Sequence, residues 1–307
     1  MSDAKVLAPS METFDGFDRN RHMFHRPTIQ RGSNTALIAV ALIAAGSLVA
    51  CSSGARSGST TLAPSVSQSA SSGSSLTLVA LGDSIPFGGP TCDGCRSFVN
   101  LFADAMTSHI GTRVVARNLV VPGATSDDLL DQVTTDQSVR PSIAAADVVT
   151  VTIGHNDTPW NRGDDACDGR LEAPDVRWNA YTASCVQTEA NRFGRTLDSI
   201  LSEITNLRGG KPTMLRITND YNDVIGLAPA VADGPTKLVL DAFTKQTCQV
   251  AEKHGAPCAD VYHAFNGAHG TNDAGALLAS DHTHPNQEGQ QLIADLLVKL
   301  GYAPLAP

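Results

Sequence analysis

Aromatic residues, excess positive charge and long apolar runs are all scarce in this chain. Only 5% of its 307 residues are aromatic, 17% are charged, and the net charge is -9. Without a surplus of basic residues the chain has no footprint for phosphate backbones, so we expect no nucleic-acid partner. The apolar run at 36–45 is short for a complete membrane span, and no internal repeat is present. What remains is typical of an ordinary globular core rich in Ala, Val and Leu.

The first 50 residues have the layout of a secretory signal. Four arginines precede the apolar run, and small residues follow it. The tetrapeptide Leu48-Val-Ala-Cys51 resembles the lipobox of bacterial lipoproteins, which implies that Cys51 is lipidated and anchors an exported, extracytoplasmic protein to the cell membrane. Two alternatives stay open: an uncleaved signal anchor in which Cys51 is incidental, and a true start at Met23.

The chain is expected to contain one folded domain, at 76–307. Residues 51–75 begin with the lipidated cysteine and continue as a Ser/Gly-rich stretch, which cannot bury enough apolar surface to fold and is interpreted as a flexible linker.

Short apolar runs alternate with helical periodicity throughout the predicted domain. Strands are expected at 76–81, 113–119, 147–153 and 212–218, with a last short strand centred on Val261, and the clearest helices at 95–109, 188–207, 236–254 and 287–300. Near-continuous apolar strands alternating with helices predict a parallel sheet of about five strands, covered on both faces in three α/β/α layers.

Six of the seven cysteines lie in the predicted domain. Their short separations favour sequential disulfides in an exported chain: Cys92 with Cys95, Cys167 with Cys185, and Cys248 with Cys258. The first pair could instead be half of a zinc site or a redox pair, but no second CxxC follows at zinc spacing.

Chemically unusual residues follow the predicted strands. These are Gly82-Asp-Ser84, Gly123, Gly154-His-Asn-Asp157 and, before the last helix, Asp281-His-Thr-His284. Ligands bind at the carboxyl ends of parallel strands, so we expect these residues to converge. Ester hydrolysis through a covalent intermediate needs a nucleophile, a base and oxyanion donors. Ser84 is the candidate nucleophile, His284 the base and Asp281 its orienting carboxylate, while the backbone N–H groups of Ser84 and Gly123 and the Asn156 amide are candidate oxyanion donors.

In this order the four clusters resemble the four blocks of the SGNH, or GDSL-like, hydrolase superfamily. The resemblance covers the chain from Leu76 onward and implies a flavodoxin-like fold, carboxylic ester hydrolysis without cofactor or metal, and the same five site residues. The chain departs from the family pattern at Ile85-Pro86 and at His155, which we expect to line the cleft. The cysteine pairs also look like those of actinobacterial secreted lipases, which favours lipid-like acyl esters.

The alternatives concern both the chemistry and the partner. Asp281-His-Thr-His284 could be a metal clip of a metallophosphoesterase, but the early Asp-x-His and the Gly-Asp-x-x-Asp of that class are missing. A degenerate domain could instead bind acylated glycans or lipids without turning them over, and an acyltransferase could use the same triad. We expect a monomer acting on a lipid or an acylated glycan. The excursion at 155–185, which contains Trp160 and Trp178, is either a substrate lid or a surface decoration.

Overall fold

The computed structural model describes residues 75–88, 92–162, 166–167 and 176–305. Within these residues the strands form one sheet in the order β2-β1-β3-β4-β5, and all neighbouring strands are parallel. The strands are β1 (Leu76–Gly82), β2 (Val114–Asn118), β3 (Val148–Thr152), β4 (Met214–Thr218) and β5 (Cys258–Ala259). The predicted α/β fold with a parallel sheet of about five strands is confirmed.

Helices surround this sheet. In the described residues the α-helices are α1 (Phe98–Ile110), α2 (Ser126–Thr135), α3 (Arg140–Ala145), α4 (Ala183–Arg208), α5 (Asp233–Lys253), α6 (Val261–Asn266) and α7 (Gln287–Lys299). Short 3-10 turns are η2 (His155–Asp157), η3 (Trp178–Ala180), η4 (Ala230–Ala232) and η5 (Gly275–Leu277). Side chains of Ser, Thr or Asn cap the first turns of α1, α2, α4 and α7, which satisfies backbone N–H groups that have no partner inside the helix.

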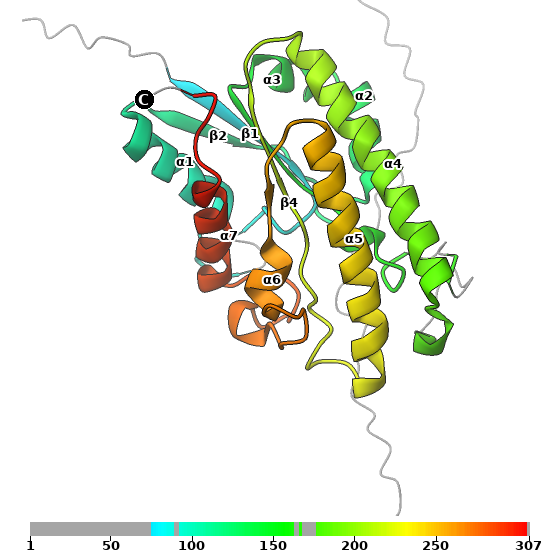
Figure 1. The fold of residues 1–307 in the computed structure, drawn as a ribbon. Coiled ribbons are helices and arrows are strands. Elements are labelled where there is room, and N and C mark those ends of the chain that lie inside the picture. Colours follow the sequence, from blue (N-terminus) through cyan, green and yellow to red (C-terminus); the bar gives the residue numbers. More distant parts are fainter. Residues whose placement is uncertain (1–74, 89–91, 163–165, 168–175, 306–307) are drawn as a thin grey trace, which may run out of the picture. The chain divides into compact units, whose positions relative to one another are not determined.

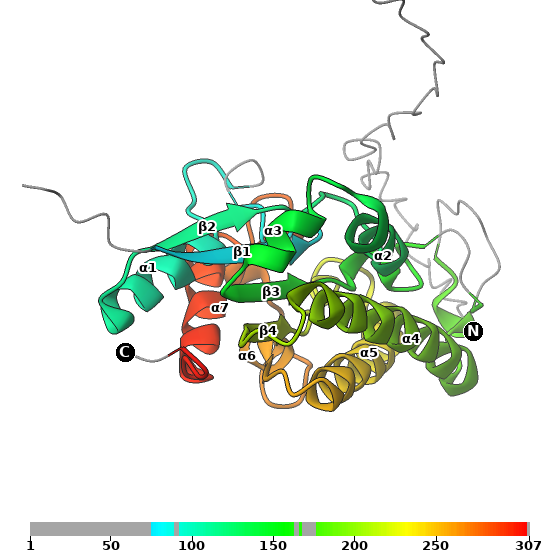
Figure 2. The same ribbon diagram turned by 90° about the horizontal axis from the view of Figure 1, so that it is seen from above.

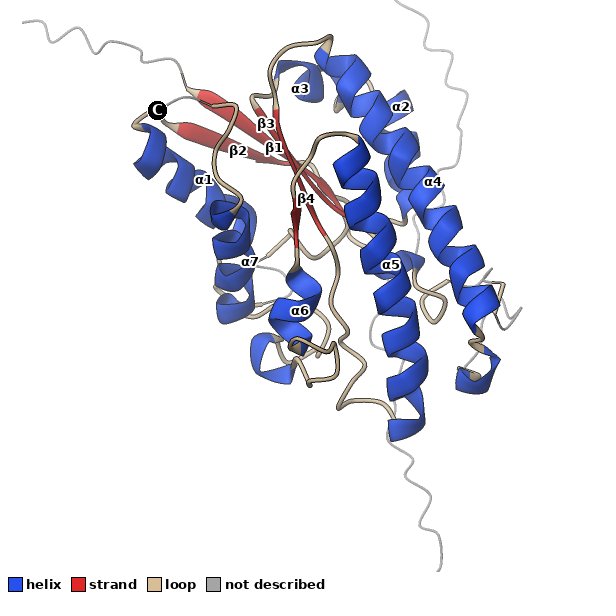
Figure 3. Cartoon of the chain, in the orientation of Figure 1, coloured by secondary structure: helices blue, strands red, loops and turns tan. Residues whose placement is uncertain are grey.

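Two hydrophobic clusters form the core, one on each face of the sheet. Val79 and Leu81 of β1 pack with α2, α3, α4 and α5, whereas Leu78 and Ala80 pack with α1, α6 and α7. Side chains of a strand alternate between faces, and β1 is apolar at both sets of positions, so it is buried from both sides. Figures 1 and 2 show α1 and α7 on one side of the sheet and α4 and α5 on the other, and Figure 3 shows the strands in red between the blue helices.

The ends of β1 and β3 approach closely at Gly82. This residue has a φ of 139°, and a Cβ atom there would overlap the carbonyl oxygen of Thr152. Only glycine fits this conformation and this approach. The peptide N–H of Asp83 then donates to the same Thr152 oxygen at 3.1 Å, which brings the residues after β1 beside those after β3.

The last predicted strand exists, but it lies two to three residues before Val261. The strand there is β5, which ends at Ala259, and Val261 begins α6. The side-chain oxygen of Asn219 accepts the N–H groups of Val261 and Tyr262, and Asp260 caps the helix by accepting the N–H of His263. Side chains have taken the donors that a strand would use, so the chain turns into a helix directly after β5.

The cysteines of the domain lie in the three predicted pairs. Cα–Cα distances are 5.3 Å for Cys92 and Cys95, 5.1 Å for Cys167 and Cys185, and 5.3 Å for Cys248 and Cys258. These distances suit disulfides. The proposed signal, the lipidation site Cys51 and the linker fall within 1–74 and lie outside the described residues. None of the helices in the part that the structure describes combines the length and apolar character of a membrane-crossing helix.

Candidate active site

Ser84 lies in a tight turn that follows β1. The N–H of Phe87 donates to the Ser84 carbonyl at 3.0 Å, and the N–H of Ile85 donates to the Asp83 carboxylate at 3.0 Å. Gln290 of α7 is fully buried and donates to the carbonyl of Ile85 at 3.3 Å. Its side-chain oxygen accepts the N–H of Phe98 at 2.7 Å. Gln290 therefore connects this turn to α7 and to the first residue of α1.

A continuous hydrogen-bonded chain joins the three triad candidates. His284 Nε2 lies 2.8 Å from Ser84 Oγ, and His284 Nδ1 lies 2.7 Å from Asp281 Oδ2. The serine and the histidine are separated by 200 residues in sequence. A neutral imidazole that donates from Nδ1 to the carboxylate presents its Nε2 lone pair to the hydroxyl, which is the arrangement that proton removal requires.

The loop around Asp281 is built to keep this carboxyl ionised. Burial alone would raise the pKa of Asp281, but hydrogen bonds from the His284 ring and from the N–H groups of His284 and Thr283 outweigh it and lower the pKa to about 2. Both N–H groups donate to Asp281 Oδ1 at 3.0 Å. Between Asp281 and Thr283, His282 adopts a φ of 56°, a left-handed conformation that is uncommon outside glycine and that turns the chain back on itself.

The three candidate oxyanion donors follow the ends of β1, β2 and β3. Within the described residues no hydrogen bond is made by the N–H of Ser84 or of Gly123, so both can serve a ligand. The Asn156 amide donates one hydrogen to the Ala124 carbonyl at 3.0 Å and retains a second hydrogen. A Cβ atom at Gly123 would meet nothing of the chain within 4 Å. The reason for glycine is its φ of 79°.

Asp157 connects η2 to the start of α2. Its carboxylate accepts both the N–H and the hydroxyl of Ser126, at 2.8 and 2.6 Å, and the guanidinium of Arg162 at 2.8 Å. Ser126 stands three residues after Gly123. Asn156 and Asp157 therefore both bond to the segment directly after Gly123, and these bonds hold Gly123 at a fixed distance from η2.

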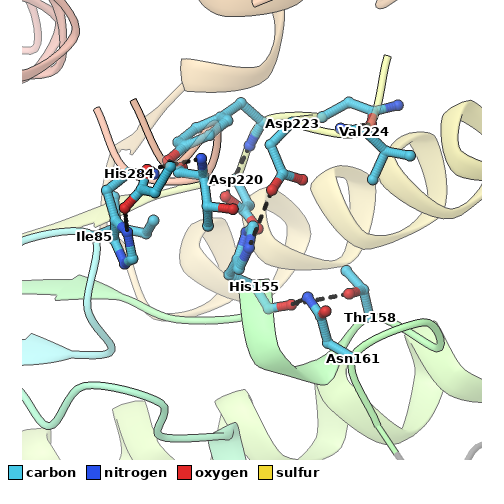
Figure 4. Close-up of polar contacts among 12 residues, drawn as sticks. Ile85, His155, Thr158, Asn161, Asp220, Asp223, Val224 and His284 are labelled. Atoms are coloured by element: carbon cyan, nitrogen blue, oxygen red, sulfur yellow. Dashed lines mark hydrogen bonds and ion pairs between the residues drawn. The ribbon is translucent and has the colours of Figure 1, made fainter. Parts of the chain in front are cut away.

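His155 does not line the cleft as expected but is buried, with 6% of its surface exposed. Its Nδ1 lies 3.0 Å from Asp220 and its Nε2 lies 3.7 Å from Asp223 (Figure 4). Burial alone would lower the pKa of His155, but the negative charges of Asp220 and Asp223 outweigh burial and raise it to about 10. Burial also raises the pKa of Asp223. The imidazole is thus an imidazolium at neutral pH.

Asp83, next to Ser84, is also buried. Only 1% of its surface is exposed, and in the described residues its Oδ2 has no hydrogen-bond partner. Burial raises the pKa of this carboxyl to about 7, and the negative charge of Asp220 acts in the same direction. A carboxyl in this range is close to half-protonated at neutral pH.

The structure thus brings all five predicted site residues to the carboxyl edge of the sheet, around β1, β2 and β3. Sequence reasoning missed the segment at 219–223, which follows β4 and supplies Asp220, Tyr221 and Asp223. The signal that located the other clusters, polar residues directly after a buried strand, is present there as Asn-Asp-Tyr-Asn-Asp and would have found it.

Comparisons with known proteins show the family. The model of the GDSL-like Lipase/Acylhydrolase family matches residues 80–292. The uncharacterized protein YpmR of Bacillus subtilis (strain 168) is 25% identical over 225 residues, which cover 71% of this chain and 78% of that protein.

Solved structures share the fold. The lipase Lip_vut3 from a goat rumen metagenome has a TM-score of 0.60 at 20% identity, covering 76% of this chain and 100% of its own. The acetylxylan esterase Axe2 of Geobacillus stearothermophilus has a TM-score of 0.51 at 19% identity, covering 75% of this chain and 96% of its own. Since the family match spans more than half of the sequence, the chain belongs to the GDSL-like lipase/acylhydrolase family and is an ester hydrolase.

Proposed function

We propose that this protein hydrolyses carboxylic esters through a serine nucleophile and an acyl-enzyme, with Ser84, His284 and Asp281 as its triad. The observation that carries the proposal is the chain of two short hydrogen bonds from Asp281 through His284 to Ser84. Hydroxyl, imidazole and carboxylate in this order are the parts that nucleophilic ester cleavage needs.

In the first half of the reaction Ser84 Oγ attacks the ester carbonyl carbon while its proton passes to His284 Nε2. The carbonyl oxygen becomes an oxyanion, which accepts hydrogen bonds from the N–H groups of Ser84 and Gly123 and from the Asn156 amide. Asp281 accepts from His284 Nδ1 and stabilises the imidazolium. Collapse of the tetrahedral intermediate breaks the bond to the alcohol, which leaves with the proton from His284.

In the second half water replaces the alcohol. His284 takes a proton from the water as it attacks the acyl carbon, the same donors hold the oxyanion, and the proton returns to Ser84 Oγ as the acid departs. An alcohol that reaches the acyl-enzyme before water would receive the acyl group, so the same residues support acyl transfer.

The geometry favours this chemistry over a metal-dependent one. Both ring nitrogens of His284 already have partners, Ser84 and Asp281, at hydrogen-bonding distance. A metal ion bound there would have to displace one of them. The complete triad also favours catalysis over a role confined to binding.

For the substrate and location we propose an ester of a lipid or of an acylated glycan, met outside the cytoplasm by a monomer anchored through an acylated Cys51. The pairing distances of the six domain cysteines support an oxidising compartment. The lipobox-like tetrapeptide supports the anchor. Metabolic labelling with an alkyne fatty acid should mark the wild-type chain and not Cys51→Ala.

Turnover of p-nitrophenyl esters tests the catalytic proposal. The wild type should release p-nitrophenol, in the presence of a chelator as in its absence, and Ser84→Ala should not. Ser108→Ala is the matched control, because Ser108 is exposed on α1 and its hydroxyl bonds only its own helix. Equal activity of Ser84→Ala and wild type would refute the serine mechanism. Extending the panel to acyl chains of different length and to acetylated xylan would define the substrate.

A further inference from the structure

A group of buried charged side chains lies after the ends of β3 and β4. His155 comes from η2, at the end of the central strand β3, and Asp220 and Asp223 come from the segment that follows β4. The His155 side chain is 7% exposed, and those of Asp220 and Asp223 are 15% and 10% exposed. None of these three residues belongs to the proposed triad or oxyanion donors.

The surroundings of His155 favour a cation. A neutral imidazole donates from one ring nitrogen only, whereas here Asp220 faces Nδ1 at 3.0 Å and Asp223 faces Nε2 at 3.7 Å. Asp83 is a further carboxyl whose charge acts on the same ring. Figure 4 shows the His155 ring directed at the side chains of Asp220 and Asp223. Two buried carboxylates without a cation between them would repel each other, and one would take up a proton.

The segment that carries Asp220 and Asp223 also contacts the loop that carries Asp281 and His284. Thr283 is the residue before His284, and its side chain lies near enough to Asp223 to act on the pKa of that carboxyl, lowering it against the effect of burial. Its carbonyl accepts the hydroxyl of Tyr221 at 2.5 Å. Tyr221 is 1% exposed and stacks on Phe265 with ring centroids 4.5 Å apart, so its hydroxyl has little freedom to move. The Thr283 carbonyl is thereby held by the segment that His155 contacts.

We propose that His155 is a positioning residue for ester hydrolysis: its cationic ring draws Asp220 and Asp223 together, the segment between them fixes Thr283, and Thr283 sets the His284 ring against Ser84. The proposal rests on the proposed function, because it assigns His155 to the Ser84 and His284 chemistry. It also gives η2 two tasks, since Asn156 and Asp157 bond to the oxyanion loop while His155 supports the loop of the base.

The expected effect is on kcat. His155→Gln removes the positive charge, the Asp220–Asp223 segment relaxes, and the His284 ring loses its alignment with Ser84. Misplacement of a reacting group by about 1 Å costs up to about 100-fold in rate, so we expect kcat to fall about 10- to 100-fold. Because His155 is buried, KM for a p-nitrophenyl ester should change less than about threefold, as for a loss confined to the transition state.

The experiment compares the full chain with two single substitutions. His263→Gln is the matched control, because His263 also pairs with a carboxylate, Asp260 at 2.7 Å, but is 44% exposed and lies outside the site. Each variant is assayed for kcat and KM. Proton NMR then follows the downfield signal of the Nδ1–H that His284 shares with Asp281, assigned by its loss in His284→Gln. We expect this signal to shift or broaden in His155→Gln and to stay unchanged in His263→Gln.

A second pair of variants covers the case in which His155→Gln does not fold. Tyr221→Phe removes the hydroxyl that holds the Thr283 carbonyl and keeps the ring stack on Phe265. Its control is Tyr262→Phe, because Tyr262 is also buried and its hydroxyl donates to Asp241 at 3.1 Å. A fall in kcat of about fivefold or more at unchanged KM, confined to Tyr221→Phe, would support the proposal.

The outcomes separate this proposal from the function on which it rests. The positioning role is refuted by a folded His155→Gln that keeps the wild-type kcat while Ser84→Ala abolishes turnover. Where His155→Gln does not fold, a wild-type kcat of Tyr221→Phe refutes it instead. Full activity of Ser84→Ala instead overturns the serine mechanism, and the positioning role with it.

Discussion

Replacement of Asp281 by asparagine should separate two effects of this carboxylate. The side chain keeps its shape, but its amide can turn an N–H toward His284 Nδ1, which then acts as an acceptor. The proton of the neutral imidazole moves to Nε2, which faces Ser84 at 2.8 Å and can no longer take the hydroxyl proton. A wrong tautomer of this kind in a serine triad costs about 10⁴ in kcat, and we expect a loss of about 10³ to 10⁴ here, with KM little changed.

The same substitution should alter the pH dependence of stability. The pKa of Asp281 is lowered from 3.8 to about 2, so the ionised form stabilises the fold by about 2 kcal/mol above the unfolded-state pKa. This contribution is present in full above about pH 5 and is lost as the pH falls toward 2, with about 1 kcal/mol already lost at pH 3. The Asp281 side chain is 16% exposed, so solvent screening does not remove the effect.

Urea unfolding of the wild type and of Asp281→Asn at pH 5, 4 and 3 measures this difference. The gap between the two free energies of unfolding should narrow by about 1 kcal/mol from pH 5 to pH 3. Kinetics at neutral pH on the same samples give the loss of kcat. A gap that stays constant with pH would refute the lowered pKa, and a kcat within tenfold of the wild type would refute the orienting role.

Three further predictions concern the oxyanion donors, the β1–β3 contact and the cysteines. Asn156→Ala should lower kcat about 10²- to 10³-fold because one oxyanion donor is lost, and a loss below threefold would remove Asn156 from the site. Gly82→Ala should destabilise the fold by at least about 3 kcal/mol in thermal unfolding, since its Cβ overlaps the Thr152 oxygen. The control Gly111→Ala, where φ is 74° but nothing lies within 4 Å, should cost about 1 kcal/mol, and equal melting temperatures would contradict the clash. A Cys51→Ala chain purified from an oxidising compartment should show no free thiol on denaturation until reductant is added, whereas six free thiols would disprove the three disulfides.

The ends of strands account for most of what could be predicted about the site. Ser84, Gly123 and Asn156 each follow a predicted strand, and parallel strands present such residues at one edge. Their convergence therefore follows once the sheet is recognised. The boundaries of the strands were also close, because β1, β3 and β4 are buried on both faces and contain few polar residues.

Contacts between distant side chains could not be predicted in this way. The pairing of His155 with Asp220 joins positions 65 residues apart, and nothing local to His155 distinguishes a buried imidazolium from a cleft residue. The misplaced position of the last strand has a similar cause. The apolar pattern around Val261 is typical of a strand, but the N–H groups of Val261 and Tyr262 donate to Asn219, which is more than 40 residues away.

The Gln290 side chain, which bonds both Ile85 and Phe98, has a consequence for when the enzyme can become active. The serine is made early in synthesis, whereas its base and the helix that braces its turn emerge some 200 residues later. Until the ribosome has passed that point, the nascent chain holds a hydroxyl with nothing to remove its proton. Under the proposed mechanism, the unfinished polypeptide therefore cannot hydrolyse an ester.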